Sequence, residues 1–185
     1  LTANEGQPIG GTNPRGSVSI VHLATGVVEH ISFTGFDGQE VALRNSGIRI
    51  FPGFSASVDL EPEYIAVSGD LNFAYAICQE QNCVITIDLT TSTPIRIDSL
   101  GKKNHLLPGN GLDPSDSNGV SINTWPVSGL YQPDSIVAFE AAGIPYLLTA
   151  NEGAARTEDA RARTLQLDPG AFPNAGFLQA NSRIG

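Results

Sequence analysis

The chain has 185 residues, of which 41% are apolar, and 19 acidic against 10 basic side chains give it a formal net charge of −9. At this length we expect one domain with a sizeable core, and no apolar run approaches the length that spans a bilayer. Such an acidic chain excludes nucleic acid as a partner, because phosphate binding needs clustered Lys and Arg. The sequence contains no Met, so we expect a processed or partial polypeptide.

Short apolar and β-branched segments separated by Gly, Pro, Asn and Asp predict antiparallel strands joined by turns. A first hairpin is expected from residues 17–23 and 27–33. Four strands at short spacing follow, at residues 63–69, 72–79, 83–89 and 93–100. A further strand pair is expected within residues 134–150, and another strand at residues 161–168. Helical periodicity is weak, and only residues 154–162 are rich in helix formers.

An internal repeat organises these strands. The hexapeptide LTANEG occurs at residues 1–6 and again at residues 148–153. A second match aligns Pro62 with Pro133, in EPEYIAV and QPDSIVA, and the same offset aligns Tyr75 with Tyr146. Repeats of this kind indicate that one structural unit recurs along the chain. In each unit we expect the hexapeptide to end the second strand and to form the turn after it.

Four-stranded antiparallel units repeated along a chain are typical of a β-propeller. We therefore predict an all-β fold, a partial β-propeller that is a fragment of a larger one. Within a single domain over residues 1–185, the complete blade is at 61–100, partial blades are at 1–33 and 134–185, and long inter-blade segments are at 34–60 and 101–133. The remaining blades are expected from sequence outside this chain or from another chain. A β-sandwich is the alternative, but it does not explain the repeated Pro and Tyr positions.

The two cysteines, Cys78 and Cys83, stand on either side of a four-residue turn between two predicted strands. Cross-strand spacing in such a hairpin suits a disulfide. Free thiols are the alternative, and a CxxxxC pair alone is a weak metal signal. The sequence thus predicts a Cys78–Cys83 disulfide and, with it, an oxidising extracellular setting.

Acidic residues recur near strand ends, about once in each repeat. They are Glu5, Glu61, Glu63, Asp134 and Glu152. Because propeller repeats bring equivalent positions to one face around a central channel, these carboxylates are candidates for a ring that attracts a cation or a basic ligand. The structural alternative is that each acid accepts hydrogen bonds from nearby backbone N–H groups.

A candidate calcium site lies in the second long inter-blade segment. The stretch DPSDSNG offers oxygen ligands from Asp113, Asp116 and Asn118, and Gly119 permits a sharp turn. Ca²⁺ prefers six to eight oxygen ligands, which loops of this composition supply. The match to an EF-hand is partial, since no Glu closes the loop, and a metal-free turn is the alternative. Trp125 is expected to anchor this segment by packing on a blade.

No catalytic residues are predicted from the sequence. The GFSAS stretch at residues 53–57 lacks the second Gly of a nucleophile elbow. The three histidines, His22, His30 and His105, are scattered without metal-ligand spacing. An alkaline phosphatase of the usual type needs zinc ligands around a nucleophilic Ser, and no such set can be assembled here.

Several motifs, in this order, resemble the choice-of-anchor I domain family. They are LTANEG, GSVSIV, LRNSGIRIFPG, EPEYIAVS, PGNGLDPSD and NTWPVSGLYQPDSI, followed by the second LTANEG. The family is similar to the mesenchyme-specific cell-surface glycoprotein of sea urchins and to β-propellers associated with alkaline phosphatases. The resemblance implies a secreted or surface-attached β-propeller of more than twice this length. The cysteine pair departs from the family pattern.

These observations predict an extracellular or cell-surface β-propeller that acts as a binding or scaffold module, with Ca²⁺ as the candidate stabilising ion. Its expected partners are the remaining blades and a cationic ligand or surface protein, with no nucleic acid and no membrane span. The alternative is part of a secreted phosphoesterase whose site forms only in the full-length protein.

Overall fold

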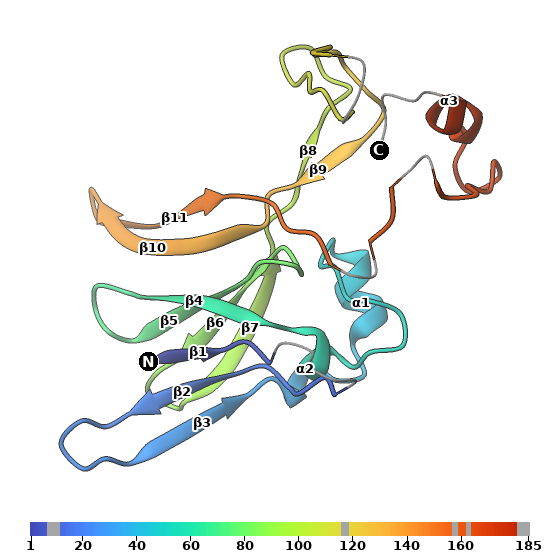
Figure 1. Cartoon of the computed structure of the whole chain (residues 1–185). Coiled ribbons are helices and arrows are strands. Elements are labelled where there is room, and N and C mark those ends of the chain that lie inside the picture. The colour runs from blue at the N-terminus through green and yellow to red at the C-terminus, as the bar shows by residue number, and fades with distance from the viewer. Residues whose placement is uncertain (7–11, 116–118, 157–158, 162–163, 181–185) are drawn as a thin grey trace. The chain divides into compact units, whose positions relative to one another are not determined.

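The structure, a computed structural model, describes residues 1–6, 12–115, 119–156, 159–161 and 164–180 (Figure 1). Most of its regular structure is antiparallel β-sheet, as the sequence predicts. The chain divides into two compact units. Unit 1 contains residues 1–101 and 130–154, and unit 2 contains residues 102–129 and 155–185. No helix among the described residues is long and apolar enough to cross a membrane.

A four-stranded antiparallel sheet forms the middle of unit 1 (Figure 1). Its strands follow one another in the order of the chain and confirm the four strands predicted there. They are β4 (Pro62–Val67), β5 (Phe73–Cys78), β6 (Cys83–Asp88) and β7 (Thr93–Ser99). The tight turn between β5 and β6 is completed by Asn82, whose φ of 53° lies in the left-handed region that Asn tolerates.

Two further sheets belong to unit 1. The first contains β1 (Thr2–Asn4), β2 (Ser17–Val21) and β3 (Val28–Ser32), and β2 and β3 form the predicted first hairpin. The second is the hairpin of β10 (Pro133–Ala141) and β11 (Ile144–Asn151). As predicted, both copies of LTANEG end a strand, β1 in one sheet and β11 in the other.

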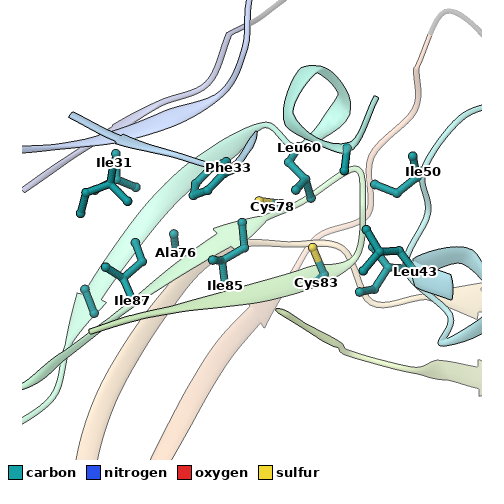
Figure 2. Packing of buried hydrophobic residues seen from close by; sticks show 14 residues of the cluster. Ile31, Phe33, Leu43, Ile50, Leu60, Ala76, Cys78, Cys83, Ile85 and Ile87 are labelled. Carbon is teal, nitrogen blue, oxygen red and sulfur yellow. The ribbon is translucent and has the colours of Figure 1, made fainter. Parts of the chain in front are cut away.

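The four-stranded sheet is covered on both faces. On one face, Ile85 and Ile87 pack in a cluster with Val18 of β2, Ile31 of β3 and Phe33, which follows β3. Figure 2 shows the part of this cluster around Ile31 and Phe33. On the other face, Ile77 and Val84 pack with Ile136 of β10. Burial of this apolar surface is the main contribution that holds the three sheets of unit 1 together.

The segment between the first two sheets contains helical turns that the sequence did not predict. They are η1 (Thr34–Phe36), α1 (Glu40–Asn45) and α2 (Ala56–Asp59). These short helices depend on side-chain contacts from distant residues rather than on periodicity. The Ser57 N–H donates to Asp37 Oδ1 at 2.8 Å, and the Ala56 N–H donates to Glu40 Oε1 at 3.0 Å.

One local prediction was wrong. Residues 164–168, expected to be part of a strand, are in a turn and irregular structure, and the described residues of 154–162, although rich in helix formers, form no helix. Thr164 donates both its N–H and its hydroxyl to the carbonyl of Arg161, at 2.9 and 2.8 Å. These local hydrogen bonds hold a turn where the alternating pattern predicted an extended strand.

Unit 2 is built on the long inter-blade segment and contains β8 (Lys102–Asn104), the paired β9 (Ser128–Leu130) and α3 (Ala175–Ala180). Trp125 is 6% exposed, and its indole N–H donates to the Leu112 carbonyl at 3.1 Å. Its ring also lies against Phe177, with centroids 6.1 Å apart. Trp125 therefore anchors the segment, but these contacts are made within unit 2, whereas the sequence predicted packing on a blade.

Candidate acidic binding site

The two copies of LTANEG have the same local structure. In each, the Thr hydroxyl donates to the Asn side-chain oxygen two residues later, at 3.2 Å from Thr2 to Asn4 and at 2.9 Å from Thr149 to Asn151. The glycine that ends each copy has a positive φ, 78° at Gly6 and 88° at Gly153. A glycine is needed there because other residues adopt this conformation at a cost. The Glu before each glycine, Glu5 and Glu152, thus follows the same strand end and precedes the same turn.

A second repeated feature places two more acids. In β4, Pro62 pairs with Cys78 and Tyr64 pairs with Ile77, so Glu63 is the extra residue of a β-bulge. In β10 the same irregularity falls between Pro133 and Ser135, and Asp134 is the extra residue. The shared bulge confirms that Pro62 and Pro133 are equivalent. Bulges redirect side chains and are frequent beside functional sites.

The proposed equivalence of Tyr75 and Tyr146 was wrong. Tyr75 pairs with Ala66, whereas Tyr146 pairs with Phe139. Measured from the shared bulge, Leu148 opposite Val137 takes the place of Tyr75. The β10–β11 hairpin has longer strands than the β4–β5 hairpin, and a constant sequence offset cannot follow that insertion.

The other carboxylates at these positions act on Glu63. Glu63 is partly buried, and its pKa is raised to about 7, first by burial and then by the negative charges of Glu80, Glu5, Asp134 and Glu152. Three other predicted acids, Glu5, Asp134 and Glu152, are therefore close enough to act on the ionisation of Glu63. We call Glu5, Glu63, Glu80, Asp134 and Glu152 the acidic cluster.

One member of the acidic cluster, Glu80, was not predicted from the sequence, and one predicted acid, Glu61, lies outside the cluster. Glu80 lies in the turn between β5 and β6, at the end of the sheet where β4 begins. The sequence does contain a signal for Glu80, because it directly follows the predicted strand at residues 72–79. Glu5 and Glu152 have similar positions after a strand in their copies of the repeat. Glu61 is different, because it is only 3% exposed and its backbone N–H donates to Gln81 Oε1 at 3.2 Å. We therefore leave Glu61 outside the acidic cluster.

Gln79 is a buried amide that forms a hydrogen bond with one member of the acidic cluster. It is 7% exposed, and its Nε2 donates to Glu152 Oε2 at 3.2 Å and to the Gln132 carbonyl at 3.2 Å. In the strand register, Cys78 lies opposite Pro62 and Asn151 lies opposite Pro133. Gln79, which follows Cys78, is therefore equivalent to Glu152, which follows Asn151. An amide at this position supplies a donor that holds the Glu152 carboxylate in place.

The geometry of the acidic cluster does not match a chelating metal centre. Among the described residues, no three His, Cys, Asp or Glu side chains are grouped closely enough to hold a metal ion. The pKa of Glu63 shows instead that the negative charges of the other four acids act together at one position. Such an arrangement attracts a cationic group through its summed field rather than through direct coordination by one tight set of ligands.

The predicted calcium loop is described only in part. Asp113 is in unit 2, where its Oδ2 accepts the Ser121 N–H at 2.7 Å and its Oδ1 accepts the Ser115 N–H at 3.4 Å. Its carboxylate therefore shapes the turn through backbone hydrogen bonds. Asp116 and Asn118 lie outside the described residues.

The two cysteines do not form the predicted disulfide in the structure. Cys78 and Cys83 face each other directly across the hairpin, as expected, but both are free thiols with no exposed surface. They lie in the apolar core with Leu60 and Ile85 (Figure 2). Burial, followed by the hydrogen bond and charge of Cys83, raises the pKa of Cys78. The thiolate is the form that oxidises, so burial slows the oxidation of this pair.

Each histidine is held by a local partner. His22 lies 2.7 Å from Glu29 on the neighbouring strand, and Glu29 also accepts the Ser92 hydroxyl at 3.0 Å. His30 Nδ1 lies 3.0 Å from the Ser19 hydroxyl, and His105 Nδ1 lies 2.6 Å from the Asn110 carbonyl. These contacts account for the scattered histidines as strand-surface and loop residues.

The fold and the acidic cluster define a β-rich repeat protein with a carboxylate surface where the repeats meet. A comparison with protein-family models matches the choice-of-anchor I domain over residues 1–185, and the chain belongs to that family. A search of the curated protein sequences found no match. Among solved structures, hydrazine synthase of Kuenenia stuttgartiensis matches 65% of this chain and 19% of its own, at 17% identity and a TM-score of 0.32. The chain thus spans about a fifth of that protein.

Proposed function

We propose that this chain is part of an extracellular or cell-surface β-propeller that acts as a binding or scaffold module, and that the acidic cluster binds a cationic ligand. In this proposal the β4–β7 sheet is a complete blade, the β1–β3 sheet and the β10–β11 hairpin are partial blades, and other sequence supplies the rest. The family membership supports the location, and the repeated strand geometry supports the propeller.

The observation that carries the binding role is the β-bulge shared by Glu63 and Asp134. Two different hairpins use the same backbone irregularity to place a carboxylate, and the hexapeptide adds Glu5 and Glu152. Burial, and then the field of these carboxylates and Glu80, raises the pKa of Glu63 to about 7. A cation placed here relieves the repulsion among the carboxylates and favours the ionised form of Glu63, so binding and deprotonation are linked.

The spacing of the carboxylates favours one class of ligand. Because the described acids form no chelating group, the supported ligand is an ammonium- or guanidinium-bearing segment of a surface protein, which several separate carboxylates bind by charge-assisted hydrogen bonds. A partly hydrated divalent ion is the alternative ligand. It would compete with the cationic segment for the negative charge of the acidic cluster.

The test is a titration of the chain with a short Arg-containing peptide and, separately, with Ca²⁺, followed by NMR and calorimetry. We expect the peptide to shift the resonances of residues around Glu63 and Asp134, with affinity that falls as salt rises. The double variant Glu63→Gln/Asp134→Asn should abolish these shifts. Glu140→Gln is the matched control, because Glu140 is an exposed acid on the same strand as Asp134. Equal binding by both variants would overturn the proposal.

A further inference from the structure

A groove lies between the β1–β3 sheet and the four-stranded sheet of unit 1, where hairpin turns of the two sheets meet. Its volume is about 590 Å³, within the range of small-ligand sites. The turns between β2 and β3, between β4 and β5 and between β6 and β7 contribute to its lining. The acidic cluster is at the other end of the four-stranded sheet, where β4 begins and β5 turns into β6 (Figure 1). The groove is therefore a separate feature of unit 1.

The floor of the groove is aliphatic. Ile20 of β2 and Leu89, which follows β6, are partly buried and pack against the core of unit 1. Leu71 of the β4–β5 turn also lines the groove and is 70% exposed. Its φ of 62° is in the left-handed region, which a leucine adopts at a cost. The turn thus holds an apolar side chain at the groove although a glycine would suit the backbone better.

The rim of the groove is polar and links the two sheets. Glu29 Oε1 lies 2.7 Å from His22 Nε2, and Glu29 Oε2 accepts the hydroxyl of Ser92 at 3.0 Å. The hydrogen bonds from His22 and then Ser92 lower the pKa of Glu29, so this carboxylate is ionised at neutral pH. The side chains of His22 and Glu29 are still 45% and 46% exposed. Because a carboxylate has about four acceptor positions, Glu29 can also accept hydrogen bonds from a ligand.

The β6–β7 turn adds hydroxyl groups to this rim. Thr90 donates its hydroxyl and its N–H to Asp88 Oδ1, at 2.6 and 2.7 Å. The Thr90 hydroxyl hydrogen is therefore in use, and its oxygen is left to accept. On the other side of the groove, His22 Nδ1 has no hydrogen-bond partner among the described residues. The rim thus combines an anionic acceptor, hydroxyl oxygens and a ring nitrogen.

Completion of the proposed blades leaves this part of the groove in place. β2 occupies one edge of β1, so a missing strand of the first blade would pair with the other edge. The polar rim instead belongs to the turns that join the outer strands, β2 to β3 and β6 to β7. The connection to residues 102–129 leaves from the opposite end of the four-stranded sheet, where Asn82 bonds to Gly101 and Tyr131 at 2.7 and 3.1 Å.

The charges at the rim select the class of ligand. An anion would meet the negative charges of Glu29 and Asp88, and a cation would compete with His22 for Glu29. A wholly apolar ligand would leave the ionised carboxylate without water or a partner. A neutral ring with several hydroxyl groups avoids all three costs, because its hydroxyls donate and accept while its C–H face covers Leu71 and Leu89.

We propose that this groove binds a neutral pyranose sugar, with sugar hydroxyls on Glu29 and Thr90 and the apolar face of the ring on Leu71 and Leu89. The site goes beyond the proposed function and does not depend on the acidic cluster.

The test is an NMR titration of the full 185-residue chain with methyl β-glucopyranoside, methyl β-galactopyranoside and methyl α-mannopyranoside in turn. We expect at least one of them, at millimolar concentration, to shift the amide resonances of residues 20–29, 67–71 and 89–92. Methyl glucosaminide, which carries an ammonium group, should bind no more tightly, and methyl glucuronide should bind more weakly. Glu29→Gln should weaken binding about ten-fold, as expected for lost hydrogen bonds to a charged group.

Leu71→Gly separates a binding role from a structural one. Glycine adopts the φ of this position freely, so the variant should bind the sugar several-fold more weakly without a lower unfolding midpoint. Leu23→Gly is its control, because Leu23 is a turn leucine that is 94% exposed and does not line the groove. Glu140→Gln is the control for the lost carboxylate, since Glu140 is an exposed acid on β10. Both controls should bind like the wild type.

Four results would overturn the proposal. They are no shift with any of the three neutral sugars, shifts that map outside the groove, equal binding by the wild type and Glu29→Gln, and binding of the glucosaminide alone. Sugar binding should also persist in Glu63→Gln/Asp134→Asn, the variant that tests the acidic cluster. This site and the cationic site can therefore fail independently.

Discussion

Glu63 and Asp134 are each the extra residue of a β-bulge that begins one residue after a proline, in two hairpins that the chain builds 71 residues apart. In a regular strand, successive side chains point to opposite faces of the sheet. The extra residue of a bulge breaks this alternation, so the bulge determines the direction of each carboxylate. Their shared position explains why acids from four separate segments influence a single ionisation, that of Glu63.

The first prediction concerns pH. The pKa of Glu63 is raised from 4.5 to about 7 in the folded protein. The unfolded chain therefore loses this proton first, and the contribution of Glu63 to the free energy of unfolding falls as pH rises from about 4.5 to about 7. Glu63→Gln, which stays neutral, should remove that fall. The variant should be more stable than the wild type at pH 8 and no more stable at pH 4.

Urea unfolding at several pH values measures this effect. Glu140→Gln is the control for the loss of one carboxylate, since Glu140 is an exposed acid that lies on β10 but outside the acidic cluster. A Glu63→Gln difference that is constant from pH 4 to pH 8 would contradict the interpretation that burial and the other four carboxylates raise this pKa.

Much of unit 1 could be predicted from the sequence because its strands alternate and its turns carry Gly, Asn and Pro. The four strands around Tyr75 and Ile85 have short connections, so local pattern and tertiary structure agree there. The acidic cluster could be predicted because the repeat itself marks equivalent positions. Glu80 was not predicted because Gln79 occupies the position that is equivalent to Glu152, and the acid follows one residue later.

The remaining structure depends on contacts that no local pattern reveals. The helical turns α1 and α2 are stabilised by bonds to Asp37 and Glu40 and by burial of Leu43 and Ala56 in the core. The insertion in the β10–β11 hairpin moved Tyr146 out of register with Tyr75. Single-sequence periodicity does not detect long-range hydrogen bonds or changes in hairpin length.

The second prediction concerns the two thiols. Cys78 and Cys83 are fully buried, and the pKa of Cys78 is raised. The folded protein should therefore react with a thiol-alkylating reagent very slowly, and unfolding in denaturant without reductant should make both cysteines react at once. Mass spectrometry counts the added groups. Denatured protein that takes up no reagent until it is reduced would instead establish a Cys78–Cys83 disulfide.

The third prediction concerns Gly16, where the chain enters β2. A Cβ atom at this position would lie 1.9 Å from the Leu60 carbonyl oxygen and 2.7 Å from Pro62 Cδ. Because the clash is with backbone, Gly16→Ala must move the start of β4, and we expect a loss of about 2–3 kcal/mol in the free energy of unfolding. Gly35→Ala is the control, since a Cβ atom there meets nothing within 4 Å. Equal unfolding midpoints for the two variants would show that β2 and β4 do not approach each other as described.

The fourth prediction concerns calcium and the loop of Asp113. The Asp113 carboxylate already accepts two backbone N–H groups, and we propose that the loop binds Ca²⁺ through its remaining oxygens and those of Asp116 and Asn118. At about 100 times its Kd, a ligand that binds only the folded state adds about 2.7 kcal/mol, which raises the midpoint of a chain of this size by about 5–10 °C. Thermal unfolding with millimolar Ca²⁺ against chelator should show this rise in the wild type and not in Asp113→Ala/Asp116→Ala.

The control for the calcium experiment is Asp98→Asn, because Asp98 is a partly exposed acid whose partner is Arg96 at 2.6 Å. This variant should keep the full response to Ca²⁺, although it loses one negative charge. The loop variant should unfold at a lower temperature even in chelator, since two backbone N–H groups lose their acceptor. If Ca²⁺ raises the midpoint equally in the wild type and the loop variant, the ion binds elsewhere. A loss of that response in Glu63→Gln/Asp134→Asn would then assign the ion to the acidic cluster.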